Sequence, residues 1–100
     1  MKIKTSELSG LALDLMVAKC EGIETSEYHE FNNEPYMPSV DWAQGGPIIQ
    51  RERIRLDPRG LWCAAHDSCE WAYYDGSTPL IAAMRCYVAS KLGEELEVMV

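Results

Sequence analysis

The chain has 100 residues, of which 47% are apolar and 25% charged, and 16 acidic side chains against 9 basic ones give a formal net charge of −7. This length and composition indicate one globular domain over residues 1–100 and exclude a disordered chain. The acidic balance argues against general nucleic-acid binding, which needs Lys and Arg facing phosphates.

No run approaches 18 consecutive apolar residues, so we expect no membrane span. The first seven residues lack the apolar stretch of a signal peptide, which favours a cytoplasmic protein. In that reducing compartment the four cysteines should be free thiols: Cys20, Cys63, Cys69 and Cys86.

The first quarter of the chain predicts a short strand over residues 1–5 and a helix over about residues 9–21. Ser9 is the candidate N-cap, and Gly22 suits a left-handed stop. Leu11, Leu15 and Ala18 are expected on the core-facing side. Residues 23–38 favour an irregular strand pair or an extended loop, with a solvated acidic face made by Glu21, Glu24, Glu27 and Glu30.

The centre of the chain predicts a single helical turn followed by a hairpin. Ser39 would cap the turn, with Asp41 favourable at its positive end, and Gly45 and Gly46 would terminate it. Pro47 would then open a strand on which Ile48, Gln50, Glu52, Ile54 and Leu56 share one side, and Ile49, Arg51, Arg53 and Arg55 the other. A turn at residues 57–60, a return strand at 61–65 and a further strand at 71–74 would follow.

The clearest pattern predicts a second long helix that begins after Ser77 or Thr78 and stops at Gly93. Pro79 would occupy its first position, where the missing N–H costs nothing. Residues 94–100 would close as a short strand. Together these elements predict an α+β fold, with two helices packed on one face of a small, mainly antiparallel β-sheet centred on the hairpin from about 48 to 65.

Two blocks of the sequence resemble one known family. The loop Asp41-Trp42-Ala43-Gln44-Gly45-Gly46-Pro47, within residues 38–49, and the helix at residues 78–93 look like parts of short phage and prophage proteins called NinX-like. Residues 1–8 and 18–22 are similar too, whereas residues 23–37 and 63–77 diverge. The resemblance implies a phage-encoded accessory protein expressed in the bacterial host cytoplasm, but it does not point to any particular activity.

The same loop carries side chains that suit a nucleotide site. Trp42 offers a face for stacking, and Asp41 and Gln44 can bind the polar edges of a base or ribose. Gly45 and Gly46 would let backbone N–H groups approach phosphates, which Arg51, Arg53 and Arg85 would also hold. The alternative is that Trp42 anchors the core and the glycines allow a tight turn into a buried strand.

Arg85 and a cysteine–histidine cluster have competing interpretations. Arg85 interrupts an apolar helix, so it is either exposed or paired with an acid, for which Asp14 is the candidate. Cys63, His66 and Cys69 have a C-x2-H-x2-C spacing that zinc accepts, but a fourth ligand would have to come from His29, Asp67 or Cys86.

The leading functional hypothesis is a non-catalytic phage protein that binds and sequesters a host nucleotide-derived small molecule, and so counters a defence pathway. The first alternative is a protein–protein inhibitor or modulator of a host factor that uses an acidic surface, and the second is a small zinc module. No catalytic motif is recognisable and no cofactor is expected. Unpaired strand edges, three tryptophans and five tyrosines favour a homodimer or higher homo-oligomer.

Overall fold

The computed structural model describes residues 2–23, 30–31, 34–66 and 69–97. Within them lie three α-helices, α1 (Gly10–Glu21), α2 (Trp42–Glu52) and α3 (Pro79–Leu92), and the short 3-10 helix η1 (Thr5–Glu7). The strands are β1 (Lys2–Lys4), β2 (Glu30–Phe31), β3 (Glu34–Pro35), β4 (Arg55–Arg59), β5 (Leu61–His66), β6 (Cys69–Gly76) and β7 (Glu95–Glu97). The predicted α+β class with antiparallel sheets is confirmed.

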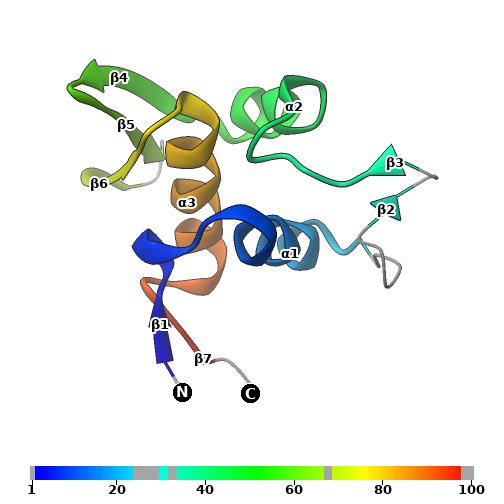
Figure 1. The fold of residues 1–100 in the computed structure, drawn as a ribbon. Helices are drawn as coiled ribbons and strands as arrows, with labels where there is room; N and C mark the ends of the chain where they lie inside the picture. Colours follow the sequence, from blue (N-terminus) through cyan, green and yellow to red (C-terminus); the bar gives the residue numbers. More distant parts are fainter. Residues whose placement is uncertain (1, 24–29, 32–33, 67–68, 98–100) are drawn as a thin grey trace.

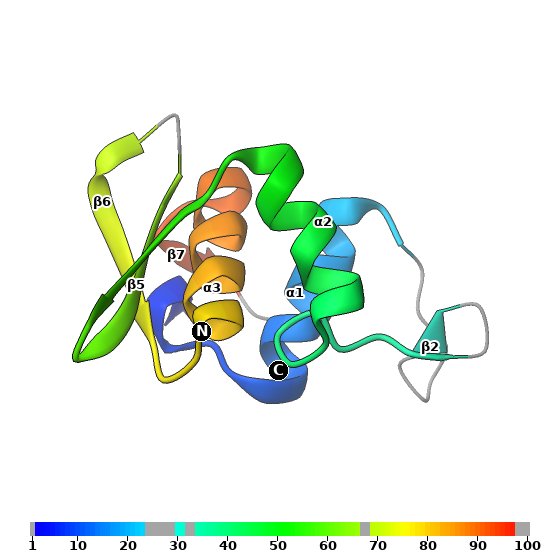
Figure 2. The same ribbon diagram turned by 90° about the horizontal axis from the view of Figure 1, so that it is seen from above.

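The described elements form layers around α3 (Figure 1). The three-stranded sheet β4–β5–β6 covers one side of α3, and α1 and α2 lie along its other side (Figure 2). β2 and β3 project beyond α1 and α2, on the side away from that sheet. Helices therefore lie on one face of the sheet, as predicted, but a third helix is present and α3 separates the sheet from the other two.

The three-stranded sheet is a meander in which each strand pairs with the next one along the chain. Arg59 pairs with Leu61 across the β4–β5 turn, and Ala65 pairs with Tyr73 between β5 and β6. The ladder shifts register between Ala65 and His66. Separately, β1 pairs with β7, with Ile3 opposite Leu96, which joins the two ends of the described chain.

The core is built on α3, which is buried on most of its circumference. Its Met84, Tyr87 and Val88 are almost inaccessible, as are Leu13 and Val17 of α1. The predicted core face of α1 was partly wrong, because Leu13 and Val17 point inward with Ala18 while Leu11 is half exposed. Apolar residues surround nearly the whole of α1, so periodicity alone could not choose the inward side.

The segment around Gly45 and Gly46 differs most from the prediction. α2 starts at Trp42, continues through both glycines and Pro47, and ends only at Arg53, which adopts a left-handed conformation. Gly45 and Ile48 are buried, which is the three-residue spacing of a helix face and not the alternation of a strand. Burial of this face outweighs the poor helix propensity of Gly and Pro.

The last helix is confirmed, with Thr78 as its N-cap and Gly93 as its C-cap. The Thr78 hydroxyl accepts a hydrogen bond of 3.2 Å from the Ile81 amide, and Pro79 is in the first turn. Gly22 ends α1 in the predicted left-handed conformation with φ of 70°. The predicted acidic face falls largely outside the described residues, because Glu24 and Glu27 are not among them. Among the helices of the described residues, none is long and apolar enough to cross a bilayer.

Candidate functional site

Asp41 and Trp42 form the start of α2. The Asp41 carboxylate accepts a hydrogen bond of 2.9 Å from the Ala43 amide, so Asp41, and not Ser39, is the N-cap. Trp42 is the first helical residue, and 52% of its surface is exposed. It therefore does not anchor the core, and its ring is available to a binding partner.

Gln44 and Gly45 hold the segment before α2 against the helix. The Gln44 side chain accepts a hydrogen bond from the Met37 amide and donates one of 2.7 Å to the Pro35 carbonyl. A Cβ on Gly45 would collide with the Pro38 carbonyl oxygen and stand 2.7 Å from Leu80 Cδ2. Gln44 and Gly45, which the sequence had suggested as ligand-binding residues, thus hold the backbone before α2 in place.

Arg51 and Arg53 lie away from Trp42 along α2. Arg51 lies nine residues further along α2, roughly 14 Å at the rise of an α-helix, and Arg53 follows at its far end. Arg51 forms a two-pronged ion pair with Glu21, at 2.6 and 3.0 Å, and a further pair with Glu52. The structure therefore clusters Asp41, Trp42, Gln44, Gly45 and Gly46 on the first turns of α2, and it places Arg51 and Arg53 away from them.

Arg85 connects two segments of backbone. Its guanidinium donates hydrogen bonds of 2.7 Å to the carbonyl oxygens of Leu8 and Asp75. Asp14, the candidate acidic partner of Arg85, does not bind it. The Asp14 carboxylate instead accepts a hydrogen bond of 2.9 Å from the Ser39 amide. Both side chains thus join elements that are distant in the sequence.

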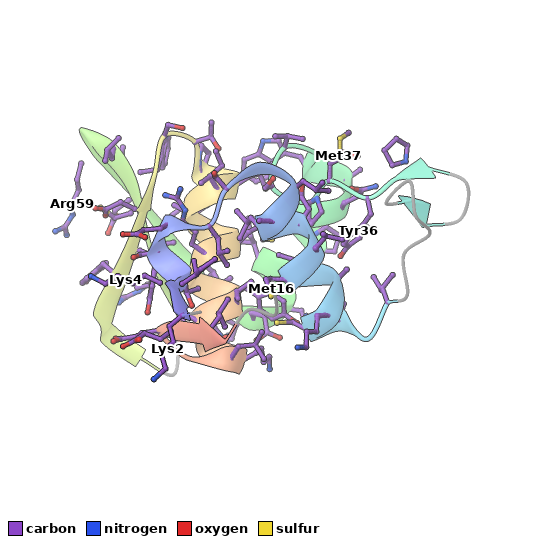
Figure 3. The ribbon with its side chains drawn as sticks, turned by 60° about the horizontal axis from the view of Figure 1, so that its bottom comes forward. Lys2, Lys4, Met16, Tyr36, Met37 and Arg59 are labelled. Carbon is purple, nitrogen blue, oxygen red and sulfur yellow. The ribbon has the colours of Figure 1, made fainter. Side chains whose placement is uncertain are left out.

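Four large apolar side chains next to α2 are exposed, and we call them the apolar surface: Leu11, Met37, Val40 and Trp42. Their exposed fractions are 51%, 41%, 63% and 52%, respectively. In Figure 3, Tyr36 and Met37 leave the same stretch of chain in different directions, and only Tyr36 is buried. Arg59 lies far from both, at the tip of the β4–β5 hairpin.

The apolar surface contains two hollows that meet at Ser39 and Val40. The smaller, about 170 Å³, lies between Trp42 and the start of α3 at Thr78 and Pro79. The larger, about 340 Å³, lies between the first turns of α1 and residues 35–40, and includes Leu11, Asp14 and Met37. Sequence reasoning had singled out Trp42 but neither Met37 nor Val40, which occur in a stretch without regular periodicity.

Asp14 is a buried acid at the larger hollow, with 6% of its surface accessible. Burial raises the pKa of this carboxyl from its ordinary value of 3.8, while hydrogen bonds from the Ser39 backbone and side chain lower it. Ser39 is itself buried, which fixes the bend before α2 against α1.

A charged cluster joins the C-terminal ends of the three helices. Its centre is Glu21 of α1, which is bound by Arg51 and by the Tyr87 hydroxyl. Those hydrogen bonds hold the pKa of Glu21 below its ordinary value of 4.5. Glu52 accepts from His66 at 3.0 Å and pairs with Lys91 at 3.6 Å, and its pKa is lowered as well, mainly by the His66 contact. The guanidinium of Arg51 is thus already paired with Glu21 and Glu52.

Two of the proposed zinc ligands, Cys63 and His66, have separate partners. The Cys63 thiol donates to Asp75 at 3.2 Å, whereas His66 contacts Glu52 on α2. Hydrogen bonding to Asp75 raises the pKa of the Cys63 thiol, which disfavours the thiolate that zinc needs. Asp67 and His29 fall outside the described residues, and the residues that are described hold no group of three or more potential metal ligands.

The chain is a small α+β protein with an exposed apolar surface where α1, α2 and α3 meet. Hydrogen bonds made by Asp14 and Gln44 hold the backbone beneath this surface in place. A comparison with protein families matches residues 4–91 to the family described as Bacteriophage P22, NinX. The chain belongs to this NinX family of phage proteins, as the resemblance of its two sequence blocks had indicated. No curated protein matches the chain significantly.

Proposed function

We propose that this member of the NinX family is a non-catalytic accessory protein that binds a bacterial host protein through the apolar surface. The observation that carries the proposal is the clustering of Leu11, Met37, Val40 and Trp42 around two adjoining hollows. Exposed apolar side chains that adjoin pockets are typical of protein-binding sites, and aromatic residues and methionine are enriched there.

The distribution of charge favours a protein over a phosphate-bearing ligand at the apolar surface. Arg51 is bound by Glu21 and Glu52, and Arg85 is bound to backbone carbonyls. The larger hollow instead contains the buried Asp14 carboxylate, and the whole chain carries a net charge of −7. Both charges repel phosphates.

Affinity capture from bacterial host cells tests the proposal, with Val40→Asp and Trp42→Ala as the surface variants. Each should lower recovery of a specific host protein at least tenfold, because each removes an exposed apolar contact. Leu61→Asp is the matched control, since Leu61 is 52% exposed but lies on the β4–β5 hairpin. Equal recovery with all three variants and the parent protein would contradict the proposal.

Sequestration of a host nucleotide-derived molecule is the second candidate. It is favoured by one observation, the exposed ring of Trp42 beside a hollow lined by Thr78, whose hydroxyl accepts from the Ile81 amide and keeps its own proton to donate to a ribose or base edge. Calorimetry against cyclic and ADP-ribose-type nucleotides tests it. Binding that is lost in Trp42→Ala but retained in Arg51→Ala would support a nucleotide at this hollow, and no heat with any nucleotide would exclude the candidate.

A further inference from the structure

The larger hollow is lined by apolar side chains around its sides and by polar side chains at its base. Leu11, Tyr36, Met37 and Val40 provide apolar walls, whereas Asp14 and Ser39 supply polar atoms. Its volume of about 340 Å³ is near the lower limit of small-ligand pockets, which begin at about 300 Å³. The hollow therefore suits one long side chain or a fragment of similar size.

Asp14 determines the sign of charge that the hollow accepts. Among the described residues that line the hollow it is the one charged side chain, and 6% of its surface is accessible. The first turn of α1 also borders the hollow, and a helix N-terminus carries a partial positive charge of about half a unit. When Asp14 is ionised, the full negative charge of its carboxylate exceeds that partial charge, so the hollow then attracts cations.

A cationic side chain with an aliphatic stem matches both parts of the hollow. Lys and Arg bury their methylene groups along apolar surface while the charged end finds a polar partner. A buried carboxylate is in turn stabilised by a cation that also hydrogen-bonds to it. No ion pair joins Asp14 to another of the described residues, and an apolar side chain of the same length would not supply one.

We propose that the larger hollow receives a Lys or Arg side chain of the host partner, with its stem against Leu11, Met37 and Val40 and its cationic end on Asp14. The inference rests on the proposed function, because it names the anchor residue of the protein bound at the apolar surface. It predicts that the partner presents a basic residue flanked by apolar ones, which complements the acidic charge of this chain.

Amide chemical-shift titrations with side-chain mimics test the anchor without knowledge of the partner. n-Butylguanidinium and n-butylammonium should shift the amides of Leu11, Asp14, Ser39 and Val40, and the neutral n-pentanol should bind at least tenfold more weakly. The guanidinium and ammonium arms distinguish an Arg from a Lys anchor. Equal binding of pentanol, or no cation-dependent shift at these residues, would overturn the inference.

Asp14→Asn and a measurement on the unaltered protein complete the test. The amide keeps an oxygen that can accept from Ser39 but lacks the charge, so affinity for both cations should fall about tenfold. Asp41→Asn is the control, because asparagine is also a good N-cap, and it should not change the affinity.

In the parent protein, butylguanidinium should lower the Asp14 pKa measured by carboxyl ¹³C shifts, and pentanol should not. If cations fail to bind while Val40→Asp still abolishes capture of the host protein, the anchor is wrong and the proposed function stands.

Discussion

Gly45 controls how closely the start of α2 approaches its surroundings. Its Cα faces the Pro38 carbonyl and the Leu80 side chain, with no room for a Cβ. Gly46, one residue on, has only Trp42 near the corresponding position, at 3.9 Å. Two adjacent glycines therefore have unequal roles, although they look alike in the sequence.

Gly45→Ala should lower the free energy of unfolding by about 1–3 kcal/mol, the usual cost of overpacking a filled site. Gly46→Ala should change it by less than about 0.5 kcal/mol, because better helix propensity is offset by crowding next to Pro47. Urea denaturation of both variants measures the difference. Equal effects would mean that the close contact between α2 and Pro38 is absent in solution.

The apolar surface shows how far single residues can be assigned from sequence. Trp42 was singled out because its ring offers a face for stacking, whereas Gln44 and Gly45, which were also predicted to bind the ligand, fix the backbone before α2 in the structure. Leu11 was expected in the core and is exposed. An apolar residue on an apolar helix carries no local signal of which neighbour covers it.

At the scale of elements, local rules predicted α1 and α3 but not α2. Both predicted helices begin after a polar residue, Ser9 or Thr78, and stop at a glycine, although only the Thr78 side chain forms a capping hydrogen bond. α2 contains two glycines and a proline, which are strong local signals against a helix. Its stability comes from contacts with segments far away in sequence, including the burial of Ile48 and the fit of Gly45 against Pro38 and Leu80. No local pattern reports these contacts.

The charged cluster at the C-terminal ends of α1, α2 and α3 should make stability depend on acid. The folded-state pKa values of Glu21 and Glu52 lie below their ordinary value of 4.5, so the unfolded chain takes up protons first. Their stabilising contribution is complete above that value and should disappear as the pH falls from about 5 through the folded-state pKa values.

Glu21→Gln should therefore lower stability by about 1 kcal/mol at pH 7, since Arg51 is half exposed and solvent screens the pair. The variant should also lose less stability than the parent protein between pH 6 and pH 3. Thermal unfolding across this range measures both effects. Glu7→Gln, at an exposed glutamate of η1, is the matched control, and identical acid profiles for the two variants would contradict a role for Glu21.

On the scale of the whole molecule, the charged cluster and the proposed binding surface lie apart. α3 is packed between the sheet on one side and α1 and α2 on the other, which fixes the backbone around it (Figure 2). The apolar surface lies where the starts of α1, α2 and α3 meet, whereas the charged cluster joins their C-terminal ends. A partner can thus be bound at one end of the helical layer without disturbing the contacts at the other.

Site-specific photocrosslinking tests this account most directly. A photoreactive phenylalanine analogue placed at Val40, the most exposed of the four apolar residues, should crosslink a defined host protein in living bacteria. The same analogue at Leu61, on the β4–β5 hairpin, should give little or none of that adduct. Strong crosslinking at Leu61 and none at Val40 would contradict the assignment of the apolar surface as the binding site.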